Sequence, residues 1–363
     1  MRIITNRNLL LESINIVQKA VPSKTTLPIL EGILFIAKNG KLTLVSTDLE
    51  LGIETSISVD VIEQGSLVVS SRIIGEIVRK LPDADVEIEK KENIIYIKSE
   101  NSEFKVLGLY QEEFPQLPSV EKDKGISISS STLKEMIRQT IFAVSTDEIR
   151  PILTGTLMEV NGKNVTMVAL DGFRMAVKNT EILSDENIKA VIPGKTLAEL
   201  GKILNDSEET VNIFTSKNQI LFQTGETTII SRLLEGEFIN YSQLIPEEYK
   251  IKIKIQTDKL LDACERAALF ARDSNNTIRF EINDDIMNIR SNSETGDVHE
   301  ELMVAKEGED IEIAFNPRYF IEALKAINNA EITIEFTTNV SPSIIKPAND
   351  SDFLYLILPV RRR

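Results

Sequence analysis

Two kinds of hydrophobic pattern alternate along the chain. Runs with an apolar residue at every second position predict β-strands; examples are KLTLVS, NIIYIKS, NVTMVAL, QILFQTG, TIRFEI and EITIEF. Stretches with helical spacing begin at residue 9 (LLLESINIVQKA), residue 132 (TLKEMIRQTIFAV) and residue 259 (KLLDACERAALFA). Gly, Asn, Asp and Lys turns separate the elements. The pattern predicts a chain of α+β class.

One predicted strand occurs twice. PILEGILFIA at residues 28–37 returns as PILTGTLMEV at residues 151–160, a shift of 123 residues. From residue 28 to residue 48, eight of 21 positions are identical under this shift. Unrelated segments of average composition would share roughly one or two. The identical residues of the first copy are Pro28, Ile29, Leu30, Gly32, Leu34, Thr43, Val45 and Asp48. The match therefore indicates a duplication.

A helix with a charged face occurs three times at the same shift. It reads SRIIGEIVRKL at 71–81, GKTLAELGKIL at 194–204 and PRYFIEALKAI at 317–327. Each copy has a basic residue, a Glu four positions later and a second basic residue three positions after that. These spacings place the three charges on one side of a helix. The sets are Arg72, Glu76 and Arg79; Lys195, Glu199 and Lys202; and Arg318, Glu322 and Lys325.

The apolar residues between these charges predict the opposite side of each helix, which should face the core. This stripe is expected at Ile73, Ile77 and Leu81 in the first copy and at Leu197, Leu200 and Leu204 in the second.

Each copy of the repeat reads helix, several strands, helix and several strands in about 120 residues, which is long enough for a domain with its own core. The polar, turn-rich segments EKDKG (121–125) and PEEYK (246–250) predict the boundaries. Three tandem domains are therefore expected, at residues 1–122, 126–246 and 248–363. In the third, the strand-level identity has faded and the charged helix survives.

Composition narrows the class of protein. With 363 residues, 42% of them hydrophobic and 27% charged, the chain is typical of a soluble protein of several domains. It has no run of 18 apolar residues and no signal-peptide core, so a cytoplasmic location without a membrane span is expected. One cysteine, Cys264, and one histidine, His299, leave no intramolecular disulfide and argue against zinc or Ser-His-Asp chemistry. No metal and no cofactor is expected.

The net charge of −15 disfavours general affinity for nucleic acid but leaves room for a local basic surface. A single charged helix face is commonly just solvated, and its ion pairs contribute only ~0.2–0.5 kcal/mol each. Three copies in register favour instead one surface for one repetitive ligand. A duplex backbone is such a ligand, because its phosphates are contacted without regard to sequence.

Four motifs carry a resemblance to a known family: VPSKTTLPILEGILF (21–35), EFPQLP (113–118), LDGFRMAV (170–177) and LILPVRRR (356–363). With the three tandem copies, they resemble the bacterial DNA polymerase III β subunit family, the replicative sliding clamps, from end to end. The resemblance implies three tandem DNA-clamp domains, each with two inner helices and outer antiparallel sheets. It also implies a homodimeric ring around double-stranded DNA, acting as a non-catalytic processivity factor in replication.

A ring is held on DNA by topology, so it needs few tight phosphate contacts and slides without sequence specificity. The resemblance implies that the pore-facing, DNA-binding residues are Lys24, Arg72, Arg79, Lys195, Lys202, Arg318 and Lys325, with Arg138 and Arg266 on the opening helices as weaker candidates.

The family also implies a groove for linear peptide motifs from the replicative polymerase subunit, the clamp loader and repair proteins. Carried over by position, it comprises Arg150, Leu153, Gly172, Phe173, Arg174, Met175, Leu244, Pro246, Asn316, Tyr319, Pro342, Ser343, Leu356, Leu358, Pro359, Val360 and Arg361. The chain departs from the family pattern at Leu170, where Thr is frequent, and at Phe173, where His is frequent. Both changes make the rim more apolar.

Ring closure is implied to bring Phe104 and Val106 of the first domain opposite Leu269 and Phe270 of the third in a second chain. Apolar residues on an open sheet edge are otherwise a liability, which pairing with a second chain would explain. The alternative is that these four are plain core residues.

Two other classes of function remain open on the residues alone. Asp48, Asp171 and Glu294 occupy equivalent turns and would suit an enzyme, but no phosphate loop, nucleophile elbow or metal-ligand spacing accompanies them. A turn role for these carboxylates is the simpler interpretation. A pure protein-binding scaffold would share the groove but would not need the basic stripe.

Overall fold

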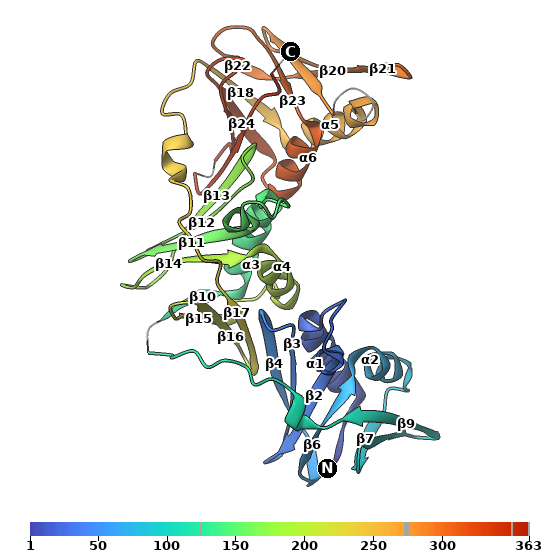
Figure 1. The fold of residues 1–363 in the computed structure, drawn as a ribbon. Helices are drawn as coiled ribbons and strands as arrows, with labels where there is room; N and C mark the ends of the chain where they lie inside the picture. Colours follow the sequence, from blue (N-terminus) through green and yellow to red (C-terminus); the bar gives the residue numbers. More distant parts are fainter. Residues whose placement is uncertain (124, 272–275, 350, 362–363) are drawn as a thin grey trace. The chain divides into compact units, whose positions relative to one another are not determined.

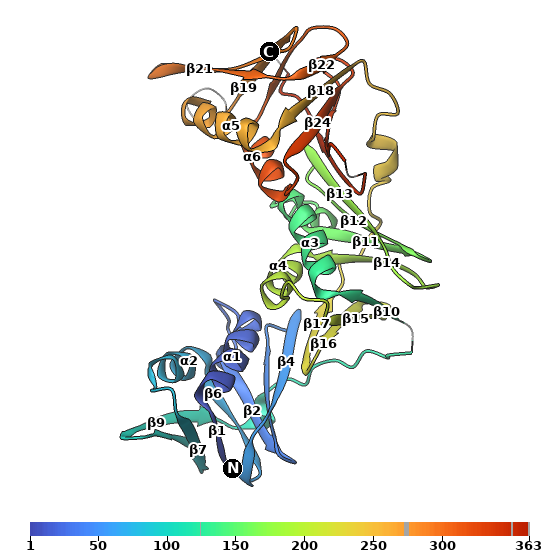
Figure 2. The ribbon, with the colours of Figure 1, turned by 180° about the vertical axis from the view of Figure 1, so that it is seen from behind.

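The computed structural model describes residues 1–123, 125–271, 276–349 and 351–361. The chain divides into two compact units, called here unit 1 (residues 1–132 and 195–233) and unit 2 (residues 133–194 and 234–363). Figures 1 and 2 trace the chain from opposite sides. The second repeat contributes to both units, so the division into units follows the sheets and not the repeats. The boundaries of the three domains expected from the sequence remain a prediction.

Unit 1 is built on one long antiparallel sheet. Among the described residues its strand order is β10-β15-β16-β17-β4-β3-β2-β6-β9-β8-β7-β1-β5. The strands are β1 (Arg2–Asn6), β2 (Gly32–Lys38), β3 (Lys41–Thr47), β4 (Leu51–Ser58), β5 (Asp60–Glu63), β6 (Gly65–Ser70), β7 (Asp85–Lys91), β8 (Ile94–Ser99), β9 (Ser102–Leu109), β10 (Gly125–Ser129), β15 (Thr210–Thr215), β16 (Gln219–Thr224) and β17 (Thr227–Arg232).

The first and second repeats join where β4 pairs antiparallel with β17. Ile53 lies opposite Ile229, and Thr55 lies opposite Thr227. The hydroxyls of the two threonines are buried and hydrogen-bonded at 2.8 Å. Backbone hydrogen bonds between β4 and β17 therefore make the sheet continuous across the repeat boundary.

The helices of unit 1 are α1 (Arg7–Val17), α2 (Ser71–Lys80) and α4 (Gly194–Ile203), which begins at the last residue of a unit 2 segment. Asn6 caps α1 by accepting hydrogen bonds from the Asn8 and Leu9 amides. Figures 1 and 2 both show α1 beside α2. Gln18, just past α1, donates to the carbonyl of Ser71 at 2.8 Å. The two helices are thereby held together.

The predicted core stripe of α2 is wrong by one position. Ile74 and Val78 are buried, whereas Ile73 is exposed and Ile77 is only half-buried. The reason is the close approach of α1: a Cβ at Gly75 would lie 2.4 Å from Gln18 Nε2, so the Gly75 face turns inward. The stripe predicted for α4, and Leu81 in the first copy, are confirmed as buried.

The repeated PIL stretches are also not strands throughout. Pro28–Glu31 and Pro151–Thr154 form 3₁₀ turns, and β2 and β11 begin only at Gly32 and Gly155. Proline has no N–H to donate and suits the first position of a helical turn, which explains the shared start. The duplication is thus preserved at the level of a turn followed by a strand.

Unit 2 holds two antiparallel sheets. Among the described residues, one has the order β14-β11-β12-β13-β26-β25-β24-β18-β22 and the other β21-β20-β19-β23. The strands are β11 (Gly155–Asn161), β12 (Asn164–Leu170), β13 (Arg174–Glu181), β14 (Asn187–Pro193), β18 (Ile251–Gln256), β19 (Ile278–Asn283), β20 (Ile286–Ser293), β21 (Gly296–Met303), β22 (Ala305–Glu307), β23 (Ile311–Phe315), β24 (Glu331–Phe336), β25 (Ser343–Pro347) and β26 (Phe353–Ile357).

The second and third repeats join where β13 pairs with β26, the last strand of the chain. Ala176 lies opposite Tyr355 and Lys178 opposite Phe353. The apolar tail is therefore a strand as far as Ile357, which keeps it from fraying. Leu356 is buried in this strand, and Leu358 follows it and is exposed.

The helices of unit 2 are α3 (Ser130–Thr140, beginning in unit 1), α5 (Thr257–Ala271) and α6 (Pro317–Ala326). Figures 1 and 2 both show α5 beside α6. Phe320 of α6 packs edge-on or tilted against Phe280 and Phe315 of the sheet, with ring centroids in this set 4.8–5.5 Å apart. Leu260 and Cys264 of α5 join this core, and burial raises the pKa of the Cys264 thiol. Cys264 is a packing residue.

The core of unit 2 gives a stability prediction. Leu260→Ala removes a fully buried side chain and should lower the free energy of unfolding by about 2–5 kcal/mol, because the cavity refills only partly. Leu183→Ala is the matched control: Leu183 is 94% exposed, so the change should stay within roughly 0.5 kcal/mol. Urea unfolding followed by circular dichroism measures both. Equal effects would contradict the core assignment.

A candidate peptide groove and the basic helix faces

A cluster of buried apolar side chains forms a distinct core of unit 2, on the sheet that joins the second and third repeats. Its buried members are Leu153, Leu157, Val168, Leu170, Met175, Val177, Val191, Phe238, Ile344 and Leu356. Half-buried side chains packed against it are Ile152, Leu234, Tyr241, Ile245 and Leu354. The cluster brings segments from four separate stretches of sequence to one place.

The predicted groove residues fall into three groups around this cluster. Buried are Leu153, Arg174, Met175, Ser343 and Leu356; half-buried are Pro246, Asn316, Tyr319, Pro342 and Pro359; exposed are Arg150, Gly172, Phe173, Leu244, Leu358, Val360 and Arg361. Pro246, Pro342 and the cluster residue Ile344 also line a hollow of about 110 Å³, whose other lining residues are mostly polar: Glu247, Glu248, Tyr249, Glu335, Thr337 and Lys346. Leu170, the first departure from the family pattern, is buried within the cluster, so the expectation that it makes the rim more apolar is wrong; of the two departures only Phe173 is exposed there.

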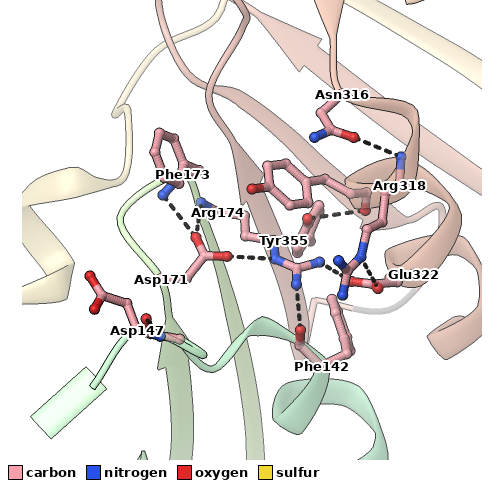
Figure 3. A network of polar contacts seen from close by, with 11 residues as sticks. Phe142, Asp147, Asp171, Phe173, Arg174, Asn316, Arg318, Glu322 and Tyr355 are labelled. Carbon is pink, nitrogen blue, oxygen red and sulfur yellow. Dashed lines mark hydrogen bonds and ion pairs between the residues drawn. The ribbon is translucent and has the colours of Figure 1, made fainter. Parts of the chain in front are cut away.

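Arg174 is the most connected residue of the region (Figure 3). Its side chain is only 4% exposed. Nε donates to Asp171 at 3.0 Å, Nη2 donates to the carbonyl of Phe142 at 2.7 Å, and Nη1 forms an ion pair with Glu322 of α6. The guanidinium also lies 4.5 Å from the ring centre of Tyr319, a cation–π contact. Its planar fork thus satisfies acceptors from three separate elements.

The turn between β12 and β13 presents the exposed rim of the cluster. Asp171 accepts the amide hydrogens of Phe173 at 2.8 Å and of Arg174 at 3.1 Å. Gly172 has φ +92°, which favours glycine. The Phe173 ring is 59% exposed and stacks on Tyr319, with centroids 6.5 Å apart. Its carbonyl accepts from the Leu358 amide at 2.9 Å, which fixes the chain tail beside it.

The charges of this network are mutually stabilised. Burial alone would lower the pKa of Arg174, but Tyr355, Glu322 and Asp171 outweigh it and this pKa is raised. Burial would raise the pKa of Glu322, but hydrogen bonds from Arg318 and Arg174 hold it below its ordinary value. Both groups therefore remain ionised at neutral pH.

The basic residues of the three repeated helices are exposed, and most are paired with carboxylates. Lys195 pairs with Asp48, Lys202 with Glu199 at 2.8 Å, Arg318 with Glu322 at 2.7 Å and Lys325 with Glu265 at 2.7 Å. Of the weaker candidates, Arg138 lies 3.9 Å from Glu135, and Arg266 donates twice to Glu300, at 2.7 and 2.6 Å. Lys24, Arg72 and Arg79 are exposed. These pairs are solvent-screened, so the cations can exchange partners.

The first predicted contact region for a second chain lies on β9, which is partly open as a sheet edge. Strand β9 pairs with β8 along its length but with β6 only at Gly108 and Leu109. Phe104 is half-buried and Val106 is buried, whereas the neighbouring Leu107 is 69% exposed. The period-two pattern KVLGL contained this signal, and the sequence reasoning missed Leu107.

The second predicted contact region lies at the end of α5, in unit 2. Leu269 of α5 is exposed, and Phe270 is half-buried beside Gly296 at the start of β21. Strand β21 forms one edge of its sheet.

Two of the three carboxylates considered for an enzyme, Asp48 and Asp171, accept backbone amides in turns. Asp48 accepts the amides of Glu50 and Leu51 at 3.0 and 2.7 Å, just as Asp171 does in its own turn. Within the residues that the structure describes, no group of three or more His, Cys, Asp or Glu side chains is placed to hold a metal ion. His299, on the exposed strand β21, donates from Nε2 to Asn288 Oδ1 at 2.7 Å.

Comparison with known proteins identifies the family. Models of the DNA polymerase III beta subunit match in order: the N-terminal domain at residues 1–118, the central domain at 127–240 and the C-terminal domain at 242–361. The beta sliding clamp of Staphylococcus aureus is 40% identical over 368 residues, covering 98% of each chain.

Solved structures agree. The DNA polymerase sliding clamp from Bacillus subtilis is 38% identical, with a TM-score of 0.96 over 100% of both chains. The beta subunit from the DNA polymerase of Streptococcus pyogenes is 30% identical, also with a TM-score of 0.96 over 100% of both chains.

Three tandem α+β domains with repeated charged helices and antiparallel sheets thus define a sliding clamp, a non-catalytic processivity factor of DNA replication. The chain belongs to the DNA polymerase III beta subunit family. The predicted fold class is confirmed. Among the described residues, no helix is long and apolar enough to cross a membrane.

Proposed function

We propose that this clamp acts in the cytoplasm as a homodimeric ring around duplex DNA and tethers the replicative polymerase, the clamp loader and repair proteins through the groove of unit 2. The observation that carries the proposal is the repeated stripe, which places exposed cations at the same helix positions in all three repeats. A repeated backbone of phosphates matches a repeated array of cations.

The charge balance supports sliding rather than tight binding. The chain carries −15 overall, and four of the repeated cations share their charge with a neighbouring carboxylate. Each phosphate contact therefore competes with an internal ion pair, which keeps the affinity per contact low. A ring needs no more than this, because topology prevents dissociation.

Reversing one cation in each repeated helix tests the DNA-facing surface. The triple variant Arg72→Glu, Lys195→Glu and Arg318→Glu should reduce loading onto nicked circular DNA about tenfold or more, because it turns a local attraction into repulsion. The measurement is co-elution of labelled clamp with the circle after incubation with clamp loader and ATP. Linearising the DNA should release the wild-type clamp.

The matched control changes the same net charge on exposed strand turns: Lys38→Glu, Lys163→Glu and Lys217→Glu. This control should load like the wild type. Equal loading by the stripe variant would contradict the proposed surface, and retention that survives linearisation would favour a protein-binding scaffold that binds DNA without encircling it.

The groove has the features that a linear peptide requires. The apolar cluster and the exposed side chains of Phe173, Leu244 and Leu358 support such a site. An apolar depression with few polar anchors is the usual site for an extended peptide. We define the probe peptide as the tightest binder among fluorescein-labelled peptides that tile the replicative polymerase of the same bacterium.

Leu358→Asp should weaken binding of the probe peptide about thirtyfold, because it places a charge where an apolar side chain of the peptide is proposed to dock. Leu358 lies outside the last strand and is exposed, so the fold should be kept. Leu183→Asp, at a remote exposed leucine, is the control and should bind like the wild type. Fluorescence anisotropy titration measures both. Unchanged binding by Leu358→Asp would contradict this location.

Ring closure is proposed through the open edge of β9 and the end of α5. Leu269→Asp should leave monomers of 40.7 kDa, whereas the wild type at micromolar concentration should show about twice this mass. Sedimentation equilibrium distinguishes the two, with Leu183→Asp as the control. A wild-type monomer across this range would contradict a stable ring.

A further inference from the structure

The guanidinium of Arg174 faces away from solvent, although the residue lies in the proposed groove. Its three hydrogen-bonding directions are used by Asp171, Phe142 and Glu322, and its side chain is almost fully buried. A peptide in the groove therefore meets the Phe173 ring and not the Arg174 charge. Arg174 instead holds Asp171 and the Tyr319 ring in place beside the proposed groove.

The repeats show what is particular about this arrangement. Under the shift of 123, Asp171 corresponds to Asp48 and Arg318 to Lys195, and in unit 1 this pair forms a direct ion pair. Arg174 corresponds to Leu51, so the first repeat has no cation at that position. In unit 2 the direct pair is replaced by a chain of four charges running from Asp171 through Arg174 and Glu322 to Arg318 (Figure 3).

The equivalent glutamates of the second and third repeats, Glu199 and Glu322, differ in the residues with which they pair. Glu199 pairs with Lys202 on its own helix, one turn away. Glu322 pairs with Arg318 on its own helix and also reaches Arg174 on β13. One residue of the charged stripe in the third repeat is therefore tied to the groove.

The contacts extend from Glu322 to the rim. Arg174 and the Phe173 amide both bind Asp171, so the position of the Asp171 carboxylate decides where Phe173 projects. Tyr319, one turn before Glu322, stacks on Phe173 and lies over the Arg174 guanidinium. Loss of the Glu322 carboxylate would leave the buried Arg174 guanidinium with too little negative charge around it. The Asp171–Phe173 turn would then be held less firmly.

We propose that Glu322 is a positioning residue for the partner groove, acting through Arg174 to hold the Asp171–Phe173 turn and Tyr319. This inference rests on the proposed peptide-binding function. It assigns to one acidic residue of the DNA-facing stripe a role in binding proteins.

The test uses the absence of tryptophan from the chain. Phe173→Trp gives the chain a single tryptophan on the rim, and the steady-state anisotropy of its selectively excited fluorescence reports nanosecond motion of the turn without any ligand. Adding Glu322→Gln to the Phe173→Trp variant should lower this anisotropy. Introduced alone into the wild-type chain, Glu322→Gln should weaken binding of the probe peptide about tenfold. Glu199→Gln is the same substitution at the equivalent position of the second repeat. It should leave the anisotropy within twofold of the Phe173→Trp value and the affinity for the probe peptide within twofold of the wild-type value.

Two further variants separate positioning from general damage. Glu322→Asp keeps the charge and should recover most of the affinity. In Arg174→Met, addition of Glu322→Gln should cause no further loss, because the two residues act as one unit. Independent, additive losses, or Glu322→Gln indistinguishable from the wild type in both readouts, would overturn the proposal.

Failure of the underlying function gives a different result. If the wild-type chain does not bind the probe peptide, or Leu358→Asp binds it normally, the groove is misplaced, whatever anisotropy the Phe173→Trp variant shows. If the groove behaves as proposed and Glu322→Gln matches Glu199→Gln, only the positioning role is overturned.

Discussion

Antiparallel pairing between strands of successive repeats is the constraint on which the rest of this structure depends. Strand β4 pairs with β17 in unit 1, and β13 pairs with β26 in unit 2. Backbone hydrogen bonds must be completed in a buried sheet, so each repeat finishes its neighbour's sheet. The second repeat is shared between both units for this reason. The same pairing positions the residues of the proposed groove, since β26 brings the chain tail beside the turn at Asp171.

The repeated charges acquire different roles through local context. In unit 1, Lys195 is paired directly with Asp48, and Lys202 with Glu199. In unit 2, Arg174 stands between Asp171 and Glu322. An exposed ion pair contributes little to stability and exchanges easily, whereas a buried guanidinium that loses a partner is costly. The same charge pattern therefore supplies exposed cations with exchangeable partners in unit 1. In unit 2, its Glu322 holds the buried guanidinium of Arg174 in place.

Particular residues show how far sequence reasoning reached. The three charged helices and their shift of 123 residues were readable because helical spacing and repetition are local properties of a chain. The stripe of α2 was misplaced by one residue, since the approach of Gln18 to Gly75 decides which side faces inward. The PIL stretches were predicted as strands, whereas their first four residues form 3₁₀ turns that start with proline. Leu107 was overlooked because its exposure depends on where β6 stops pairing with β9.

The sequence by itself determined the α+β class, the three-fold repetition, the absence of disulfide chemistry and the helices that carry paired charges. These follow from composition, period and spacing, which need no knowledge of distant contacts. Only the tertiary structure decided that Arg174 turns its charge inward, that the Glu322 side chain reaches from α6 to pair with it, and that Phe173 is exposed. Those outcomes depend on which residues far apart in the chain become neighbours, and burial then fixes which charges must be paired.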